Sequence, residues 1–145
     1  SRANLHALLD QGELVLLFPE GIHGIGKPFS QRYQLQRWTE GHVELAIRHG
    51  VPVVPVAVVG AEEAMPQLGR VEFIKAFGAP WLPIPATLIP FPVRCHIWYG
   101  APIHFAVPPE AADDPAIVDA AALHVRHAVG ALLEHGLAAR QGFFS

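Results

Sequence analysis

The feature that most constrains the fold is an uninterrupted apolar run at residues 14–18, which is followed by Pro19-Glu20-Gly21. An apolar run bounded by turn residues is typical of a strand buried on both faces. Proline stops the hydrogen-bond ladder and glycine permits a sharp turn, so the carboxylate of Glu20 is delivered to the rim of a sheet. Because ligands of open α/β sheets bind beyond the carboxyl ends of strands, we expect a binding site at this rim.

The composition indicates one domain with an unusually high apolar content. The 145 residues are 51% hydrophobic and 16% charged, whereas about a quarter charged is usual in soluble domains. Either a very continuous core or apolar surface that faces a membrane or a partner accounts for the excess. No apolar run of about 18 residues is uninterrupted, so the sequence predicts no transmembrane helix.

Charge and cysteine content exclude two further classes. A formal net charge of −3 argues against a nucleic-acid-binding groove. The single cysteine, Cys95, excludes an internal disulfide and fits a reducing compartment, where we expect it to be an inert buried thiol. The chain starts with Ser and opens directly into a helical pattern, which we interpret as an N-terminally truncated domain; a processed or recombinant start would look the same.

Helical and strand patterns alternate along the chain, which favours an α/β fold: a sandwich with a mostly parallel central sheet flanked by helices. The predicted elements are a helix at 4–10, a strand at 14–18, a loop at 21–36, a helix at 39–49, a strand at 53–59, short strands near 71–74 and 94–99, and a helix at about 114–136.

Two helices carry clear boundary signals. For the helix at 39–49, Thr39 is the expected N-cap and Gly50 the expected stop. Its apolar face is predicted to be Val43, Ala46 and Ile47. The last helix has Asp113 or Asp114 as its cap, Pro115 at its first position and Gly136 beyond its end.

Two more blocks follow Phe-Pro-Glu-Gly at 18–21, namely Gly-His-Val-Glu-Leu-Ala at 41–46 and Gly-Val-Pro-Val-Val-Pro-Val at 50–56. In this order, the blocks resemble the second half of a phospholipid/glycerol acyltransferase domain of the lysophosphatidate acyltransferase-like superfamily. The resemblance covers about residues 3–105 and implies that residues 1–145 are the C-terminal part of one such domain. In that family, Phe-Pro-Glu-Gly is the acceptor-binding motif.

The resemblance implies acyl transfer from a coenzyme A or acyl-carrier-protein thioester to a lipid hydroxyl, with no metal or resident cofactor. The family's catalytic pair is His-x-x-x-x-Asp, in which His is the general base. None of the nine histidines here has Asp five positions later; His6 and Asp10 are one residue short. We therefore expect these 145 residues alone to be inactive.

The motif also departs from the family's commonest version. Phe-Pro-Glu-Gly there continues as Thr-Arg-Ser, and the Arg is thought to hold the acceptor's phosphate, whereas residues 22–24 here are Ile-His-Gly. Neutral His23 is a poor substitute for a bidentate Arg. Lys27, Arg32 and Arg37 are alternative cations, although charges in a polar loop are usually only solvated.

A second pattern is similar to the mono- and diacylglycerol acyltransferase-like branch of the superfamily. It consists of Lys27, Tyr33, Leu35 and Gly41, followed by Gly-Ala-Glu-Glu at 60–63. A neutral acylglycerol or another alcohol is therefore nearly as strong an expected acceptor as lysophosphatidate.

The candidate substrate-binding residues are Phe18, Pro19, Glu20, Gly21, His23, Lys27 and Arg32. Glu20 either hydrogen-bonds an acceptor hydroxyl or backbone amides, or simply caps a turn. Gly24 and Gly26 suggest a nest of backbone amides around an anion, which is a weak signal without a full phosphate loop.

Prolines and large apolar residues alternate at 81–91. This segment is either a membrane-interface element or a buried connection packed by its own prolines. With the resemblance, it favours a peripheral protein on the cytoplasmic side of a membrane, with a lipid acceptor and acyl-CoA as partners. His124 and His127 have the spacing of a metal pair but no third ligand, so we interpret them as exposed helix positions.

Two other function classes compete with the enzyme. A non-catalytic lipid-binding or scaffold domain of the same fold would also lack His-x-x-x-x-Asp. A serine hydrolase is disfavoured because the chain has no Gly-x-Ser-x-Gly.

Overall fold

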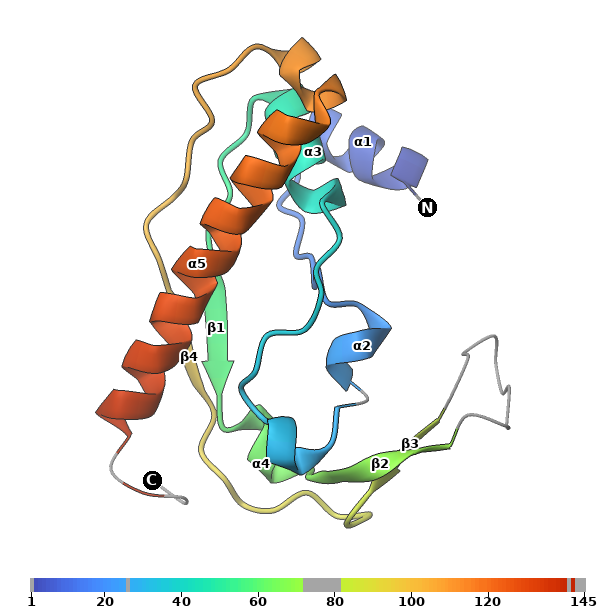
Figure 1. Cartoon of the computed structure of the whole chain (residues 1–145), viewed down its shortest axis with the longest axis vertical. Coiled ribbons are helices and arrows are strands. Elements are labelled where there is room, and N and C mark those ends of the chain that lie inside the picture. Colours follow the sequence, from blue (N-terminus) through green and yellow to red (C-terminus); the bar gives the residue numbers. More distant parts are fainter. Residues whose placement is uncertain (1, 26, 72–81, 141, 143–145) are drawn as a thin grey trace. The chain divides into compact units, whose positions relative to one another are not determined.

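The computed structural model describes residues 2–25, 27–71, 82–140 and 142 (Figure 1). The chain forms two compact units. Unit 1 comprises Ser1–Pro19, Trp38–Pro55 and Gly100–Val129, and unit 2 comprises Glu20–Arg37, Val56–Tyr99 and Gly130–Ser145. Helix α5 (Pro115–Ala139) contributes residues to both units.

Unit 1 is built from helices around a small apolar core. Its elements are α1 (Arg2–Asp10), α3 (Gly41–His49), η2 (Pro109–Asp113) and the first part of α5. The predicted apolar face of α3 is buried, and the helix packs against η2. The core residues of this unit are Val43, Ile47, Ala111, Ala112, Val118, Ala121 and Val125.

The two ends of α3 differ in how well the sequence anticipated them. Gly50 ends the helix in the left-handed conformation, with a φ of 62°, as a glycine stop should. The predicted N-cap is wrong: Glu40 occupies that position, and no side chain caps the helix. Thr39 bonds to other groups instead: its N–H and its hydroxyl donate to the carbonyl of Pro19 at 3.1 Å and 3.4 Å, and its carbonyl accepts from His42.

The predicted buried strand at residues 14–18 is not formed. This segment has no regular secondary structure, and Leu14 is 98% exposed and Phe18 74% exposed. An apolar run becomes a buried strand only when neighbouring strands pair with it, and none of the described strands does so. The prediction is therefore wrong for the chain as described.

Unit 2 contains two antiparallel strand pairs. Strand β1 (Val56–Val59) pairs with β4 (His96–Tyr99), and β2 (Gln67–Val71) pairs with β3 (Leu82–Pro85). Both described pairings are antiparallel, and the mostly parallel central sheet stays a prediction. Residues 72–74 of one predicted strand lie outside the described residues.

Three short helical elements complete unit 2. They are α2 (Ile22–Ile25), η1 (Phe29–Gln31) and α4 (Ala61–Ala64). The first two lie in the stretch that was expected to be an irregular loop. Cys95 lies just before β4 and is exposed, so the expectation of a buried thiol in a strand is wrong.

Helix α5 begins at its predicted cap and continues through its predicted stop. Asp114 Oδ1 accepts the N–H of Ala116 at 2.9 Å. Gly136 lies inside the helix and is buried. A Cβ at this position would lie only 2.6 Å from Trp98 Nε1 and 2.9 Å from Val59 Cγ2, so no larger residue fits without a shift. Glycine at this position allows the helix to lie close to β1 and β4, so packing outweighs its tendency to end a helix.

Of the described helices, α5 alone is long and apolar enough to cross a membrane, judged by length and composition. The core helix of a soluble protein passes the same test, and Val118, Ala121 and Val125 of α5 belong to the core of unit 1. His124 and His127 are exposed on this helix, as their structural interpretation requires.

Candidate functional site

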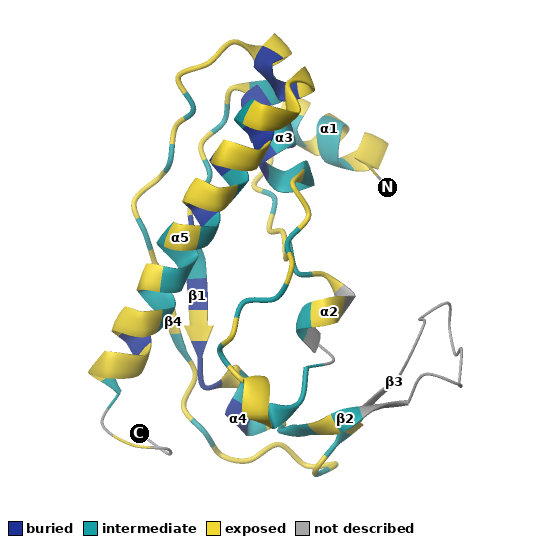
Figure 2. Cartoon of the chain, in the orientation of Figure 1, coloured by how far each residue is buried: buried dark blue, intermediate teal, exposed yellow. Residues whose placement is uncertain are grey.

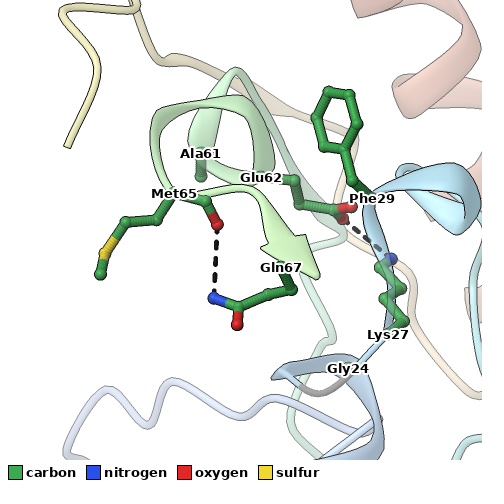
Figure 3. A pocket seen from close by; sticks show the side chains of 7 residues that line it. All are labelled: Gly24, Lys27, Phe29, Ala61, Glu62, Met65 and Gln67. Atoms are coloured by element: carbon green, nitrogen blue, oxygen red, sulfur yellow. Dashed lines mark hydrogen bonds and ion pairs between the residues drawn. The ribbon is translucent and has the colours of Figure 1, made fainter. Parts of the chain in front are cut away.

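Unit 2 contains a cavity of about 300 Å³ immediately after the Phe-Pro-Glu-Gly block (Figure 3). It is formed by α2, the segment that follows it, α4 and the start of β2. Its lining residues are Gly24, Lys27, Phe29, Ala61, Glu62, Met65 and Gln67.

The charged groups of this cavity neutralise one another. Lys27 Nζ lies 2.8 Å from Glu62 Oε1 (Figure 3). The same nitrogen donates to the carbonyl of Gln34 at 3.0 Å. Glu62 Oε2 accepts the backbone N–H of Tyr33 at 3.0 Å. The side chain of Lys27 is only 8% exposed, so its charge is held by Glu62 and is little screened by water. The wall therefore presents a compensated ion pair.

Glu20 lies directly behind this wall. Its Oε1 accepts the backbone N–H of Gln36 at 2.9 Å, and its carbonyl accepts that of His23 at 3.2 Å. A Cβ on Gly24 would lie 2.6 Å from Glu20 Oε2, so the carboxylate packs against a glycine that lines the cavity. The contact with a backbone amide is thus present, and Glu20 ties two sides of the loop together.

Arg32 is held by two neighbours. Its Nε lies 3.7 Å from Glu63 Oε1, and its guanidinium lies 4.6 Å from the centroid of the Phe29 ring. Glu63 is buried and also forms an ion pair with Arg140, whose side chain is 8% exposed. Because a buried carboxylate needs cationic partners, this cluster is part of the unit's internal structure.

Tyr33 connects the loop to the junction of β1 and α4. Its hydroxyl accepts the N–H of Gly60 at 2.8 Å, and its φ of 62° is unusual for a residue other than glycine. Burial raises the pKa of Tyr33; the negative charge of Glu63 raises it further, and the bond with Gly60 opposes both. The phenol is therefore neutral at physiological pH.

Unit 1 contains a second cavity, of about 270 Å³. Apolar side chains dominate it, and the two first residues of the Phe-Pro-Glu-Gly block contribute to it. Its lining residues are Arg2, Leu5, Leu17, Phe18, Pro19, Thr39, Gly41, His42 and Leu45.

His42 is the one imidazole in the lining of this second cavity. Its Nδ1 lies 2.8 Å from the carbonyl of Thr39, and because a carbonyl only accepts, we assign the proton to Nδ1. Its Nε2 is buried without a hydrogen-bond partner in the part of the chain that the structure describes. Burial lowers the pKa of His42, while the contact with Thr39 and the charge of Glu40 oppose this shift.

The structure divides the seven predicted binding residues between the two units. Phe18 and Pro19 line the cavity of unit 1, and Lys27 lines that of unit 2. The others belong to unit 2 without lining its cavity: Glu20, Gly21, His23 and Arg32. Gly26, half of the suggested amide nest, lies outside the described residues.

The sequence reasoning missed Glu62 and Glu63 as functional candidates. Their signal was present as two consecutive carboxylates that follow Gly60 after one alanine; Gly60 ends the second apolar strand. The sequence did not predict that these carboxylates contact Lys27 and Arg32, because no local spacing relates the two segments.

A chain of three titratable side chains lies in unit 1. Asp10 Oδ1 is 3.0 Å from His49 Nδ1, and His49 Nε2 is 2.8 Å from His6 Nδ1. His6 and Asp10, whose spacing is one residue short of the catalytic pair, thus both contact His49. Among the described residues, no group of three or more His, Cys, Asp or Glu side chains has the arrangement of a metal site.

Comparison with known protein families gives a match over the first part of the chain. The acyltransferase family model matches residues 1–59. The matched residues contain the Phe-Pro-Glu-Gly block and the two blocks that follow it.

Similar proteins occur in mycobacteria. Uncharacterized proteins of Mycobacterium tuberculosis and Mycobacterium bovis are 38% identical over 150 residues, which is 96% of this chain and 42% of theirs. An uncharacterized protein of Mycobacterium leprae is 36% identical over 153 residues, covering 98% of this chain and 42% of its own length. The chain thus spans less than half of these relatives. No solved structure matches it.

Proposed function

We propose that this chain, whose residues 1–59 match the acyltransferase family, supplies the acceptor-binding part of an O-acyltransferase. The acyl group comes from acyl-CoA or acyl carrier protein, and the acceptor is a hydroxyl of a glycerolipid. The enzyme works peripherally on the cytoplasmic side of a membrane. The cavity that follows the Phe-Pro-Glu-Gly block supports the acceptor assignment.

The assignment of the acceptor rests on the ion pair between Lys27 and Glu62. A lysophosphatidate brings a phosphate that requires unpaired cations, ideally a bidentate Arg. The cavity offers a lysine that already has a carboxylate partner, and His23 stands where the family's commonest motif has Arg. A neutral acylglycerol leaves this pair intact, so we assign a neutral acylglycerol as the acceptor.

The chemistry requires a base that removes the proton of the acceptor hydroxyl while its oxygen attacks the thioester carbonyl and the thiolate leaves. The sequence contains no His-x-x-x-x-Asp to supply that base. The contribution of these residues is therefore to hold and orient the acceptor, which alone contributes substantially to such reactions.

A binding competition tests this assignment. The purified chain is mixed with detergent micelles that contain a monoacylglycerol or the lysophosphatidate with the same acyl chain. We expect tighter binding of the monoacylglycerol; preferential binding of the lysophosphatidate contradicts the assignment. An acyl-transfer assay with the same material is expected to give no product, and measurable acylation would show that these residues contain a complete active site.

The absence of the catalytic pair also favours a second candidate, a non-catalytic lipid-binding or scaffold domain of the same fold. The gene sequence before residue 1 separates the two. An in-frame extension that encodes His-x-x-x-x-Asp supports the enzyme, and a start codon immediately before Ser1 supports the scaffold.

A further inference from the structure

The segment between β3 and β4 is largely exposed (Figure 2), and its exposed residues include large apolar ones. Leu88 is 92% exposed and Ile89 80%, the highest values among the large apolar residues described in unit 2. Ile84 and Phe91, on either side, are also exposed. The alternative of a buried connection packed by its own prolines is therefore wrong for this part of the chain; Trp81 lies outside the described residues.

The sequence around this segment is free of charge and has cations at both ends. Residues 76–93 contain no Asp, Glu, Lys or Arg, and the nearest charged residues are Lys75 and Arg94. Arg94 is exposed. An uncharged apolar segment with basic flanks fits an anionic lipid surface, because the side chains enter the apolar boundary while the cations meet headgroup phosphates.

Part of the backbone of residues 84–91 is already prepared for an apolar environment. Pro85 and Pro90 have no N–H to desolvate. The N–H groups of Ala86 and Phe91 each donate to a backbone carbonyl of unit 2 at 2.8 Å. The carbonyl of Ile89 accepts from the Thr87 hydroxyl at 2.7 Å. These bonds also fix the shape of the loop, so little ordering is needed when it docks.

We propose that residues 84–91 form a membrane-docking loop, which inserts Leu88 and Ile89 into the apolar boundary of an anionic bilayer. A protein partner fits the observations less well, because stable protein interfaces bury about 800 Å² on each side with 20 or more residues. A bilayer accepts a few side chains at the tip of a loop. The inference deepens the membrane association in the proposed function by naming the segment that docks, and it does not depend on whether the cavity binds an acylglycerol.

Vesicle co-sedimentation tests the docking loop. The purified chain is expected to bind vesicles of phosphatidylcholine with phosphatidylserine more tightly than vesicles of phosphatidylcholine alone. Replacing both Leu88→Ser and Ile89→Ser should weaken binding about 100-fold, or about 10-fold for each side chain. Arg94→Glu should weaken binding to the anionic vesicles only.

A matched control uses apolar residues that are equally exposed elsewhere. Leu14 and Leu16 are 98% and 69% exposed in unit 1, and their double replacement by Ser should leave vesicle binding unchanged. If this control loses as much binding as the loop variant, adhesion is unspecific and the proposal is wrong. The same holds if the wild-type chain does not bind, or if the loop variant binds like the wild type.

A second measurement reports insertion directly and does not depend on the folding of the serine variants. In a Cys95→Ser background, an environment-sensitive fluorophore is attached to Leu88→Cys, and in a parallel sample to Glu134→Cys on α5. Vesicles should shift the emission of the label at position 88 to the blue and leave the label at 134 unchanged. An unshifted label at 88 would overturn the proposal.

Discussion

Lys27 Nζ and Glu62 Oε1 lie 2.8 Å apart in the wall of the unit 2 cavity, and the same Lys27 nitrogen donates to the carbonyl of Gln34. The ammonium group of Lys27 therefore already has an ion-pair partner and a hydrogen-bond acceptor in the protein without a ligand. A lysine with 8% exposure has little water to replace a lost partner, so the carboxylate is needed both for stability and for the charge of the cavity.

Glu62→Gln should change which acceptor the cavity prefers. The variant leaves Lys27 without its carboxylate partner, so Lys27 can form a charge-assisted contact with a phosphate. The affinity for lysophosphatidate should therefore rise by about tenfold relative to that for monoacylglycerol. The same variant should lose about 1–3 kcal/mol of unfolding free energy. Micelle competition and urea unfolding measure the two effects.

The matched control is Glu13→Gln, which removes an exposed carboxylate of unit 1. It should leave both the preference and the stability unchanged. If Glu62→Gln loses stability but keeps the wild-type ratio of affinities, then Lys27 does not meet the acceptor, and the assignment of a neutral acceptor loses its basis.

Tyr33 should make the stability of the protein sensitive to alkaline pH. Burial raises the pKa of the folded-state phenol, whereas an unfolded tyrosine ionises near pH 10. As the pH rises above about 10, the unfolded state loses its proton first and becomes favoured, so this contribution is complete below that pH and is lost above it. Urea unfolding at about pH 9 and about pH 11 should show the loss.

Tyr33→Phe isolates this effect and removes a hydrogen bond. The buried N–H of Gly60 loses its acceptor, which should cost about 1–3 kcal/mol at neutral pH. The decline in stability with alkaline pH should be smaller in the variant than in the wild type. An identical decline in both proteins would assign it to other groups. Absorbance titration of Tyr99→Phe follows Tyr33 alone, because the chain has two tyrosines.

Local signals made the ends of elements predictable in this chain. Gly50 adopts a positive φ that few other residues tolerate, and Asp114 caps the helix that Pro115 begins. Each of these features depends on a few neighbouring residues, so the sequence contains the whole cause. The apolar face of α3 was predictable for the same reason, since its period is set within the helix.

Features that depend on a distant partner were not predictable. The run at residues 14–18 has the pattern of a strand, but pattern alone supplies no neighbouring strand. Gly136 has the signature of a helix end, yet Trp98 and Val59 make it a contact point inside α5. The contact between Lys27 and Glu62 joins two segments that no periodicity relates. The sequence therefore indicated Lys27 as a candidate cation but did not predict that Glu62 is its partner.

His42 should make stability fall at mildly acidic pH. Burial lowers its pKa in the folded state, so an unfolded chain takes up a proton near pH 6.5 before the native protein does. This contribution is complete above that pH and is lost as the pH falls through the lower folded-state value. In His42→Gln, the amide side chain still provides a donor for the carbonyl of Thr39 but has no group that takes up a proton in this pH range.

Urea unfolding of wild type and His42→Gln at about pH 7.5 and about pH 5.5 compares the two titrations. The acid-induced loss should be larger for the wild type. His127→Gln, which changes an exposed histidine of α5, should behave like the wild type. Equal losses in wild type and His42→Gln would show that this imidazole does not couple to folding.

Gly24→Ala should damage the site more than the fold. The new methyl group would lie 2.6 Å from Glu20 Oε2, so the carboxylate must move away from the N–H of Gln36. The end of a flexible side chain moves easily, and we expect a loss of only about 1 kcal/mol. The loop behind the cavity loses its tie, so monoacylglycerol binding should fall at least about tenfold, or about 1.4 kcal/mol.

Two comparisons make this prediction specific. Gly130→Ala places its methyl group 3.9 Å from Leu35 Cδ1, an ordinary contact, and should gain about 0.5–1 kcal/mol as an alanine in a helix interior. In a Glu20→Ala background, Gly24→Ala has no carboxylate to displace and meets only the Cβ of residue 20 at 3.1 Å, so most of its effect on binding and stability should disappear. Additive effects of the two substitutions would mean that Glu20 and Gly24 act separately, and that the carboxylate does not hold the wall of the cavity.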